Sequence, residues 1–355
     1  MSLDELRDQI NQVDADIVRL LARRVAISKK IGAEKKRQRK PVHDPRRERA
    51  VLDRVRTLAR DAKLNPDDVE EVYRQIFTAS KGVQGIDVAF QGEIGAYSEE
   101  AAFRFLGNSI NVKPCEDLDG VFNAVETGEV PYGIVPIENS LEGSISRTYD
   151  LLLDSSPKVC GETELRVIHC LIAHPEATLE SIKRVYSHPQ ALGQCGAFLR
   201  HFGRQVVPTY DTAGSVKMIK EQGITDGAAI ASARAARVYG MKVLAREIED
   251  NPHNFTRFFV LAKADSPRTG RDKTSIVFSV RHRPGALYEL VKEFAARNIN
   301  LTKIESRPTR QKPWEYNFYL DFEGHRLDKA AKEALATLDS ISLFVKVLGS
   351  YPRAR

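Results

Sequence analysis

Residues 29–49 carry ten Lys and Arg side chains in twenty-one positions. Within this run Asp44 is followed by Pro45, a pair that typically begins a helix. Arg47 and Glu48 come three and four residues after Asp44, on the side of the helix where the next apolar residues also lie. Charged side chains among apolar ones need partners or a charged ligand, because unpaired buried charge is costly. The pattern indicates a pocket for a small anion.

The excess of positive charge belongs to the first quarter of the chain. Residues 1–85 hold 20 Lys and Arg against 14 Asp and Glu, a net charge of +6, whereas residues 86–355 hold 34 of each kind. A basic segment of this size could contact nucleic acid. However, its aromatic residues are only Tyr73 and Phe77, and it shows neither a helix-turn-helix pattern nor a platform for stacking bases. We therefore expect no nucleic-acid partner.

Length and composition are those of a soluble globular protein with two or three domains. No stretch reaches the ~18–20 apolar residues of a transmembrane helix, and the N-terminal residues do not resemble a signal peptide. No C-x-x-C pair or zinc-finger spacing occurs among the four cysteines, which are Cys115, Cys160, Cys170 and Cys195. They are typical of reduced thiols. We expect a cytoplasmic protein that binds neither metal nor membrane.

The first domain, residues 1–84, has the pattern of three helices. Apolar residues recur at steps of three and four, and no proline occurs before position 41, so one helix is expected over residues 3–38. Start signals predict further helices over residues 44–63 and 65–82. A helix of about 35 residues is far longer than the globular mean of ~12. So long a helix with so little core favours an intertwined homodimer or a larger homo-oligomer.

From residue 86 the pattern changes to short apolar strands that alternate with helices. The segments that read as strands are IDVAF, YGIVPI, VIHCLIA, RVYSH, QVVPT, AAIAS and FFVLA. This order predicts an α/β domain with parallel strands over residues 86–263. A polar segment with Pro and Gly, residues 264–273, then reads as a linker.

The C-terminal domain, residues 274–352, has the order strand, helix, strand, strand, helix, strand. The expected strands are 274–281, 301–308, 315–322 and 343–351, and the expected helices are 285–298 and 328–339. This βαββαβ order predicts an α+β ferredoxin-like sandwich.

Arginine and lysine side chains of the first domain could bind a small anion, because guanidinium groups capture carboxylates in a bidentate manner. On one ideal helix Arg7 and Arg23 are sixteen residues apart and point about 160° away from each other, at ~100° per residue. One chain could not easily direct both at one small ligand. A partner chain could supply Arg7.

Five segments of this domain resemble the all-helical chorismate mutases: LRDQI, LARR, KKIGAEK, PVHDPRRE and a last helix ending in S-x-x-x-Q. The resemblance covers nearly all of residues 3–84 and implies that chorismate is bound and converted to prephenate. It implies catalytic roles for Lys35, Glu48 and Gln84. The substrate-binding residues that it implies are Arg7 (from the other subunit), Arg23, Asp44, Arg47 and Ser80.

The reaction of that family is an intramolecular Claisen rearrangement, which needs neither a nucleophile nor a cofactor. Catalysis has to come from holding the reactive diaxial conformer and from placing cations near the ether oxygen, where negative charge develops. A lysine and a Gln amide suit that oxygen. Two simpler interpretations stay open: the charges could be salt bridges of a helical dimer, and Asp44 could be only an N-cap.

Polar motifs of the second domain resemble those of prephenate dehydratases across residues 86–263. The motifs are QGEIGAYS (91–98), VPIENS (135–140), SHPQ (187–190) and NFTRF (254–258). The first follows a strand and opens a helix, so it could hold an anion. One departure is Glu93, where the family commonly has proline. The resemblance implies a two-lobed α/β domain.

The dehydratase reaction protonates a ring hydroxyl while the carboxylate leaves as carbon dioxide, and it needs no metal. The resemblance implies Thr256 as the proton donor, with Asn139 and Gln190 orienting the substrate. A threonine hydroxyl is a weak acid, so it must be desolvated and aligned, or must relay a proton. His188 is the alternative acid because histidine titrates near neutrality, although it could equally be structural. The other substrate-binding residues implied are Ser98, Ser140, His188 and Arg257, of which Arg257 could instead form a structural ion pair.

The C-terminal domain resembles the phenylalanine-responsive ACT domains. The motifs that carry the resemblance are Gly285-Ala286-Leu287 at the start of its first helix and Glu305-Ser306-Arg307-Pro308 on its second strand, with Trp314 nearby. The resemblance implies that phenylalanine binds as an effector between two copies of the domain. Gly285 has no side chain, so the backbone there could approach a ligand closely. The alternative for the strand motif is an ordinary edge strand.

The order mutase, dehydratase and ACT resembles the bifunctional chorismate mutase–prephenate dehydratases of phenylalanine biosynthesis, a branch of the shikimate pathway. Two rivals remain. The chain could be a dehydratase for prephenate or arogenate with an idle mutase domain, or a sensor whose two-lobed domain only binds a small molecule. A sensor would not need the full set of matched cations and amides in the first domain. We therefore expect two activities, no cofactor, and inhibition by phenylalanine.

Overall fold

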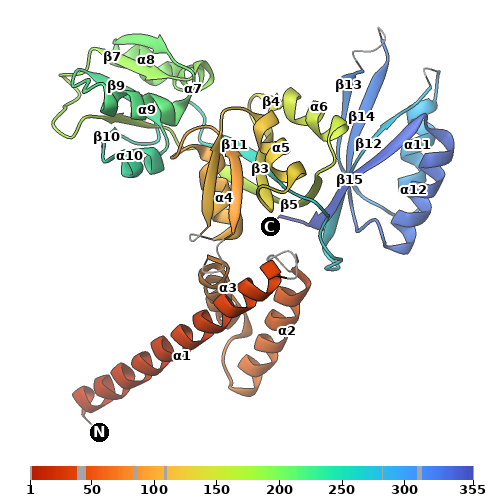
Figure 1. Cartoon of the computed structure of the whole chain (residues 1–355), viewed down its shortest axis with the longest axis horizontal. Coiled ribbons are helices and arrows are strands. Elements are labelled where there is room, and N and C mark those ends of the chain that lie inside the picture. Colours follow the sequence, from red (N-terminus) through yellow and green to blue (C-terminus); the bar gives the residue numbers. More distant parts are fainter. Residues whose placement is uncertain are drawn as a thin grey trace. The chain divides into compact units, whose positions relative to one another are not determined.

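The computed structural model describes residues 2–37, 45–82, 86–107, 110–281, 283–309 and 314–354. The chain divides into two compact units (Figure 1). Residues 1–87 and 103–111 form a helical unit, and residues 88–102 and 112–355 form an α/β unit. Of the helices in the described part of the chain, none is long and apolar enough to cross a membrane.

The helical unit contains the three expected helices, α1 (Leu3–Arg37), α2 (Pro45–Asp61) and α3 (Pro66–Gly82). Helices α2 and α3 pack on each other, and their buried residues include Val55, Ala59 and Phe77. The side chain of Arg56 on α2 forms ion pairs with Asp67 (2.7 Å) and Glu70 (2.6 Å) on α3.

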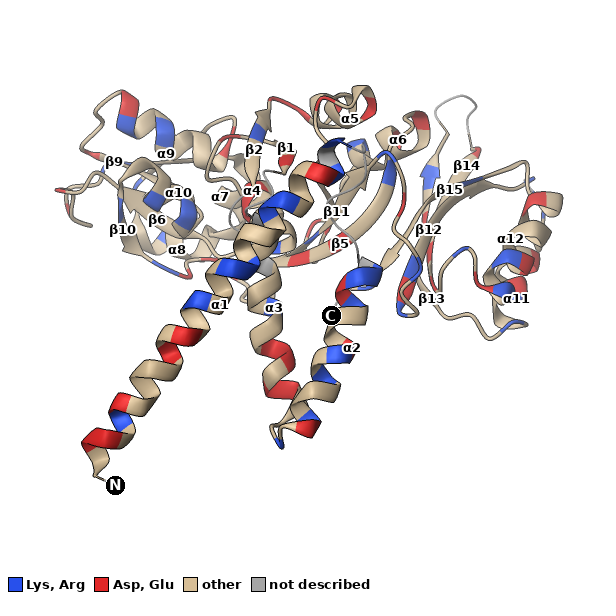
Figure 2. Ribbon diagram, turned by 60° about the horizontal axis from the view of Figure 1, so that its bottom comes forward, with Lys and Arg blue, Asp and Glu red and all other residues tan. Residues whose placement is uncertain are grey.

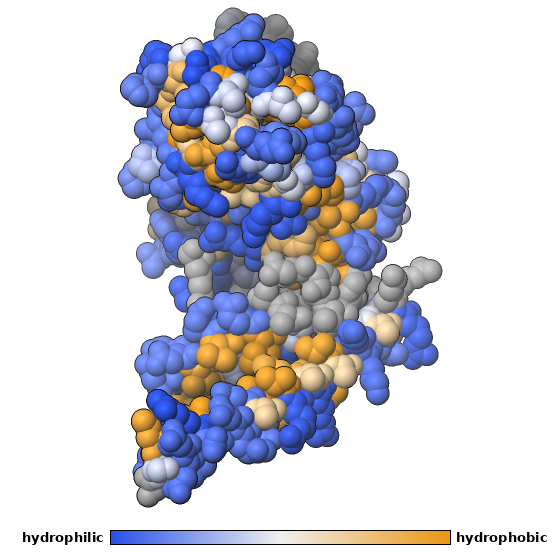
Figure 3. Space-filling view, turned by 90° about the vertical axis from the view of Figure 1, so that its left-hand side faces the viewer, coloured by the Kyte–Doolittle hydropathy of each residue, from blue (hydrophilic) through white to orange (hydrophobic). Residues whose placement is uncertain are grey.

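Helix α1 leaves its apolar stripe exposed. All residues from 2 to 20 are exposed, including the large hydrophobic residues Leu3, Leu6, Ile10, Val13, Ile17 and Leu20. Figure 3 shows hydrophobic residues along the surface of the helical unit. The basic residues of α1 gather on its C-terminal half (Figure 2). A long helix with an exposed apolar stripe is the pattern of a helix that packs on another chain.

The first lobe of the α/β unit is built on one mixed sheet with the strand order β2-β1-β3-β11-β5. Its strands are β1 (Asp87–Gln91), β2 (Asn111–Cys115), β3 (Tyr132–Asn139), β4 (Gly143–Ser144, paired with β3), β5 (Lys158–Arg166) and β11 (Phe255–Ala262). Its helices are α4 (Tyr97–Leu106), α5 (Leu118–Thr127) and α6 (Ser146–Asp154).

The second lobe is built on a five-stranded sheet with the order β10-β6-β9-β7-β8. Its strands are β6 (Cys170–Ala173), β7 (Arg184–Ser187), β8 (Gln205–Pro208), β9 (Gly227–Ala231) and β10 (Lys242–Ala245). Its helices are α7 (Pro189–Gln194), α8 (Gly196–Phe202), α9 (Thr212–Glu221) and α10 (Ala233–Tyr239).

The expectation of parallel sheets is wrong in part, because both sheets are mixed. Strand β1 is parallel to β3, but β11 is antiparallel to both β3 and β5. The chain leaves the first lobe after β5, builds the second lobe, and returns as β11, which inserts between β3 and β5. The sequence pattern also missed the strands β2, β5 and β10. In β5, charged residues interrupt the apolar run that marks a buried strand.

The ACT domain has the expected βαββαβ order. Its elements are β12 (Asp272–Ser279), α11 (Ala286–Ala295), β13 (Leu301–Pro308), β14 (Tyr316–Glu323), α12 (Lys329–Ile341) and β15 (Phe344–Pro352), and the antiparallel sheet has the order β13-β14-β12-β15. Residues such as Phe278, Phe294 and Phe322 form a core between this sheet and its two helices.

The ACT domain and the first lobe share a second hydrophobic core. Val277, Tyr319 and Tyr351 of the ACT sheet pack in one buried cluster with Phe259 and Leu261 of β11. The backbones approach closely at Gly349, where a Cβ atom would collide with the carbonyl oxygen of Val159. The segment expected as a linker is also anchored, because the buried Ser266 donates to the carbonyl of Cys160 (2.6 Å). The ACT domain is therefore packed against the first lobe and is not tethered loosely to it.

Candidate functional site

In the helical unit, the structure brings one arginine of α1 to the last turns of α3. Arg24 donates a hydrogen bond to the hydroxyl of Ser80, which is buried, and its guanidinium lies 5.4 Å from the ring centroid of Phe77. The hydroxyl of Ser80 in turn donates to the carbonyl of Ile76 (2.7 Å). Burial lowers the pKa of Arg24. This desolvated cation beside a hydroxyl is suited to hold a carboxylate.

The arginine that contacts Ser80 is the neighbour of the one expected from sequence. Arg23 is exposed, whereas Arg24 is half-buried. Arg24 and Lys35 are eleven residues apart, close to three full helical turns, so they share one face of α1. Arg23 lies about 100° around the helix from that face. The geometry thus favours Arg24 over Arg23 as the α1 arginine of the mutase site.

The other expected mutase residues are only partly placed. Asp44 and Gln84 lie outside the described residues. Arg47 is exposed and Glu48 half-buried, both in the first turn of α2. Arg7 is exposed and forms an ion pair with Asp4 (3.2 Å).

Arg7 lies far from the Ser80 region. It lines an open groove with apolar neighbours of the first turns of α1, which are Leu3, Leu6, Ile10 and Val13. It is seventeen residues from Arg24, or about 25 Å along the helix axis. One copy of α1 cannot bring both guanidinium groups to one small ligand.

In the α/β unit, Thr256 and Asn139 are partners across β11 and β3. The Asn139 amide Nδ2 donates to the Thr256 hydroxyl (3.0 Å), and both side chains are buried. The Asn139 Oδ1 accepts from the backbone N–H groups of Leu141 (3.0 Å) and Glu142 (3.1 Å), which fixes the orientation of the amide. Because the Thr256 oxygen accepts from Asn139, its own hydrogen remains available for a ligand. Both residues were expected from sequence.

A chain of hydrogen bonds runs from this pair into the second lobe. The Asn139 Nδ2 also donates to Asn254 Oδ1 (2.8 Å), and Asn254 Nδ2 donates to Gln194 Oε1 (2.8 Å). The ring Nε2 of His169 lies 3.0 Å from the same Gln194 oxygen. The sequence motifs pointed to Gln190, which is exposed on α7, whereas Gln194, at the end of that helix, joins the network. Burial and partner identity, which decide this, are not visible in a motif.

His169 ends this chain of hydrogen bonds and is buried. Because Gln194 Oε1 is an acceptor, His169 carries a proton on Nε2 and donates it to that oxygen. The His169 Nδ1 lies 2.9 Å from the Tyr97 hydroxyl, whose single hydrogen is shared between Nδ1 and the carbonyl of Ile168 (2.8 Å). Burial lowers the pKa of His169, although its bond to Gln194 and the carboxylate of Glu249 act in the opposite direction. The neutral ring holds the Gln194 amide in place.

The remaining expected residues of the dehydratase motifs have local roles in the structure. Ser140 donates to the carbonyl of His253 (2.9 Å) and accepts from the N–H of Phe255 (2.9 Å), which ties the end of β3 to the start of β11. His188 is the N-cap of α7, with its Nδ1 accepting from the N–H of Gln190 (3.3 Å). Ser98 is buried in the first turn of α4.

The loop expected to hold an anion is occupied by carboxylates of the chain itself. The N–H of Gly95 donates to Glu99 (2.8 Å), whose carboxylate also pairs with Arg234 (2.7 Å). Glu93, the departure from the family pattern, reaches the second lobe, where it pairs with Lys217 (3.0 Å) and accepts from the Tyr210 hydroxyl (3.1 Å). This loop joins the two lobes.

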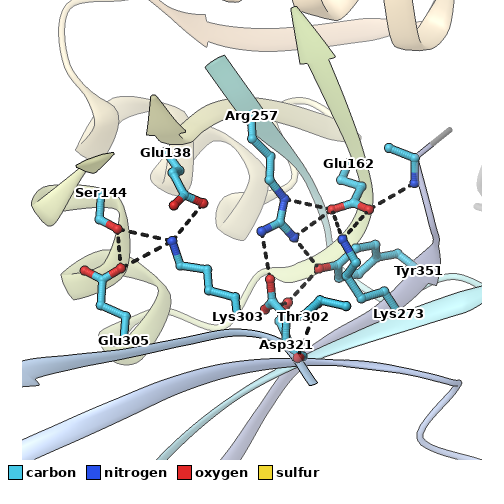
Figure 4. Close-up of polar contacts among 12 residues, drawn as sticks. Glu138, Ser144, Glu162, Arg257, Lys273, Thr302, Lys303, Glu305, Asp321 and Tyr351 are labelled. Atoms are coloured by element: carbon cyan, nitrogen blue, oxygen red, sulfur yellow. Dashed lines mark hydrogen bonds and ion pairs between the residues drawn. The ribbon is translucent and has the colours of Figure 1, made fainter. Parts of the chain in front are cut away.

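Arg257 does not join the Thr256 cluster. Its guanidinium forms ion pairs with Glu162 (2.6 Å) and Asp321 (2.8 Å), on the side of β11 that faces the ACT domain (Figure 4). Of the two interpretations that the sequence left open, the structural ion pair is the one that the geometry supports.

The strand motif of the ACT domain is divided between the two faces of its sheet, and the glycine motif begins a helix. Gly285 has a positive φ of 81° at the start of α11, a conformation that favours glycine; Ala286 and Leu287 are the first residues of that helix. On β13, Glu305 bonds Ser144, and Arg307 donates to Ser146 (2.8 Å), both of the first lobe. Ser306 lies between them and is exposed on the opposite face. Part of the strand motif therefore contacts the first lobe.

Comparison with known proteins identifies three family regions in this order. Residues 6–85 match chorismate mutase type II, residues 88–266 match prephenate dehydratase, and residues 274–340 match the ACT domain. A bifunctional chorismate mutase/prephenate dehydratase of Aquifex aeolicus is 39% identical over 99% of this chain and 98% of its own length. The chain belongs to the bifunctional chorismate mutase/prephenate dehydratase family. It is an enzyme with a mutase domain, a dehydratase domain and an ACT domain.

Other relatives cover part of the chain. An arogenate dehydratase/prephenate dehydratase of Arabidopsis thaliana is 43% identical over 84% of this chain and 80% of its own length. The structure of a prephenate dehydratase from Arthrobacter aurescens in complex with L-Phe has a TM-score of 0.70 and 34% identity, over 76% of this chain and 90% of that one. A structure described as the quorum quenching acylase GqqA has the same TM-score and 33% identity, over 75% and 97% of the two chains.

The neutral His169 predicts a dependence of stability on pH. Its folded-state pKa lies below its unfolded value of ~6.5, so the unfolded chain binds the proton first as the pH falls. Stability should therefore be lost as the pH drops below about 6.5. In His169→Gln, the urea midpoint of the α/β unit should fall less between pH 7.5 and pH 5.5 than in the wild type.

The matched control for this measurement is His201→Gln, because His201 is exposed on α8. It should keep the wild-type dependence on pH. An unchanged dependence in His169→Gln would assign the acid sensitivity to other groups.

Proposed function

We propose that this chain catalyses two successive reactions at two separate sites. The helical unit rearranges chorismate to prephenate, and the α/β unit dehydrates and decarboxylates prephenate to phenylpyruvate, with phenylalanine as inhibitor through the ACT domain. The observation that carries the proposal is the buried Thr256–Asn139 pair, whose hydroxyl hydrogen is available for a ligand. The first test supplies chorismate to the pure protein and follows chorismate loss and phenylpyruvate formation separately.

The mutase site is proposed to combine residues of two chains. Arg24 and Lys35 share one face of α1, and Arg47 and Glu48 lie in the first turn of α2. Arg7 would come from the partner copy, because its distance along α1 prevents it from reaching the same ligand. The exposed apolar stripe of α1 supports a homodimer, since a second copy would cover it. The arginines would hold the two carboxylates, and Lys35 with Gln84 would stabilise charge on the ether oxygen.

The dehydratase site is proposed to use Thr256 as the proton donor to the departing hydroxyl. A hydrogen bond donated by Asn139 to the threonine oxygen favours loss of the threonine proton, because it stabilises the negative charge that develops there. Desolvation in the buried site and coupling to loss of carbon dioxide supply the remaining driving force. Gln190, His188, Ser98 and Ser140 remain proposed substrate contacts, as the family resemblance implies. Neither reaction is proposed to use a metal or a cofactor.

Two finer properties belong to the same proposal. The Arabidopsis relative is named for arogenate as well as prephenate, so both substrates should be assayed with this chain. We place the enzyme in a reducing cytoplasm, because its four cysteines are free thiols and three of them are buried. The domain bounds that we propose are residues 1–84, 86–263 and 274–352.

Adjacent arginines provide a matched test of the mutase site. Arg24→Ala should lower chorismate consumption by about 10²–10³-fold, as expected when one cation that stabilises the transition state is removed. Arg23→Ala should stay within a few-fold of the wild type because Arg23 is exposed on another face of α1. Dehydration of supplied prephenate is the internal control and should survive in both variants. The reverse result, with loss only in Arg23→Ala, would restore the assignment made from sequence.

Mixing two inactive chains tests whether Arg7 acts across the dimer. Refolding Arg7→Ala chains together with Arg24→Ala chains should give hybrid dimers in which one of the two sites holds both arginines. Random pairing of equal amounts should restore about one quarter of the wild-type mutase activity. No recovery in dimers confirmed by sedimentation would show that Arg7 acts within its own chain or not at all.

The proton donor can be tested by removing the hydroxyl of Thr256. Thr256→Ala should reduce kcat for prephenate dehydration by about 10²–10⁴-fold with little change in prephenate binding, because general acid catalysis contributes on this scale. Thr256→Ser should retain much more activity. A fully active Thr256→Ala enzyme would move the acid role elsewhere, and His188→Gln would be the next variant to assay.

A further inference from the structure

Strands β11 and β3 each carry two consecutive side chains with different surroundings. On β11 these are Thr256 and Arg257, and on β3 they are Asn139 and Glu138. In the register of the two strands, Thr256 lies opposite Asn139, and Arg257 lies opposite Glu138. Successive side chains of a strand point to opposite faces of the sheet. Thr256 and Asn139 lie at the proposed dehydratase site, whereas the side chains of Arg257 and Glu138 both face the ACT sheet (Figure 4). The register of β11 against β3 shifts directly after Arg257, and such bulges re-aim side chains beside active sites.

Arg257 is held by carboxylates of two domains. Its Nε and Nη2 bond Glu162 of β5 (2.8 and 2.6 Å), and its Nη1 lies 2.8 Å from Asp321 Oδ2 of β14. Only 12% of the Arg257 side chain is exposed, with 1% of Glu162 and 8% of Asp321. Buried charges of this kind must stay paired. The backbone next to Thr256 is thereby tied to the ACT domain.

Further ACT residues complete this buried network. Lys273 of β12 pairs with Glu162 (2.8 Å), and the hydroxyl of Tyr351 lies 3.2 Å from Arg257 Nη2. The hydroxyl of Ser275 donates to Asp321 (2.5 Å) and lies 2.6 Å from that of Tyr351. Two cations thus face two anions, and the ACT sheet supplies one of each.

A second connection between the ACT domain and the proposed site runs through Glu138, the residue before Asn139. Its carboxylate pairs with Lys303 of β13 (2.8 Å), whose side chain is 14% exposed. Lys303 also pairs with Glu305 (3.3 Å), which belongs to the strand motif expected to respond to phenylalanine, and Glu305 bonds Ser144 of β4. A displacement of β13 would therefore act on the backbone that carries Asn139.

We propose that Arg257 and Glu138 are positioning residues, through which Asp321 and Lys303 of the ACT sheet set the geometry of the Thr256–Asn139 pair. The same two contacts transmit the effect of phenylalanine to dehydration. This inference rests on the proposed roles of Thr256 and of phenylalanine. It explains why Arg257 sits beside the proton donor in sequence without taking part in its cluster.

The test uses the full-length enzyme with Asp321→Asn and, separately, Lys303→Met, since deleting the ACT domain would also expose the shared hydrophobic core. Each variant should lower kcat for prephenate dehydration by about tenfold or more, with the KM for prephenate within about threefold, because a small misplacement of catalytic groups costs rate. Calorimetry should still detect L-phenylalanine binding, while inhibition at saturating L-phenylalanine should weaken. Arg257→Lys, which keeps one charge but loses the fork geometry, should show the same split to a smaller extent.

Glu323→Gln is the matched control, because Glu323 is also an ion-paired carboxylate of β14 but is more exposed, at 33%. It should leave kcat and inhibition unchanged. Mutase activity of the same preparations gives the concentration of active helical unit, and L-phenylalanine binding by calorimetry reports that the mutated α/β unit is folded. If Asp321→Asn does not fold, Lys303→Met alone decides.

Two results would overturn the proposal. One is an increase in KM for prephenate at unchanged kcat, which would make Arg257 a substrate clamp. The other is wild-type kcat and wild-type inhibition in both ACT variants. Failure of the underlying proposals would be visible separately, as wild-type enzyme that does not bind phenylalanine or as a fully active Thr256→Ala variant.

Discussion

The pairing of Arg257 with Glu162 and Asp321 is the constraint on which the α/β unit depends most directly. A guanidinium buried to this degree is tolerated only while its counter-charges are present, and removing one partner of a buried ion pair costs roughly 3–5 kcal/mol. The three residues come from β11, β5 and β14. Their interaction therefore holds β11 beside β5 in the sheet of the first lobe and holds that sheet against the ACT domain. The guanidinium of Arg257 lies over the ring of Phe259, which packs edge-to-face with Tyr351 in the shared hydrophobic core.

Because side chains alternate along β11 and β3, consecutive residues of each strand face opposite sides of the sheet and have different roles. One face holds a hydroxyl and an amide that could act on a substrate, while the other holds charges that are neutralised by a different domain. A strand cannot be displaced on one face without being displaced on the other. If Thr256 and Asn139 act as proposed, the ACT domain would influence them through the backbone of these strands, without contacting the substrate.

In the helical unit, the main constraint is the distance between the arginines along α1. Its chemistry requires several fixed cations around a small dianion, but a single long helix spreads its arginines over many turns. Arg24 is fixed by Ser80 and Phe77 on α3, whereas Arg7 lies in a groove among exposed apolar side chains. The length of α1 and its uncovered stripe have one common explanation in a second copy of the chain, which would cover the stripe and bring a distant arginine back to the site.

The sequence by itself determined the order of the three domains, the three helices and the βαββαβ pattern, and its motifs indicated Thr256 and Asn139 as candidate site residues, because periodicity and short motifs are local properties. That these two side chains meet across β11 and β3 came from the tertiary structure. The sequence did not distinguish Arg23 from Arg24, which lie on different faces of α1, or Gln190 from Gln194, which differ in burial and in hydrogen-bond partners. It also missed the strands β2, β5 and β10, which lack a clear apolar run, and the mixed sheets, because β11 returns from the other lobe and finds its partners through long-range pairing. The sequence left open whether Arg257 contacts the substrate or forms a structural ion pair. Only the tertiary structure decided it, because its partners Glu162 and Asp321 lie 95 residues before it and 64 residues after it in the chain and meet it only when the ACT sheet packs on the first lobe.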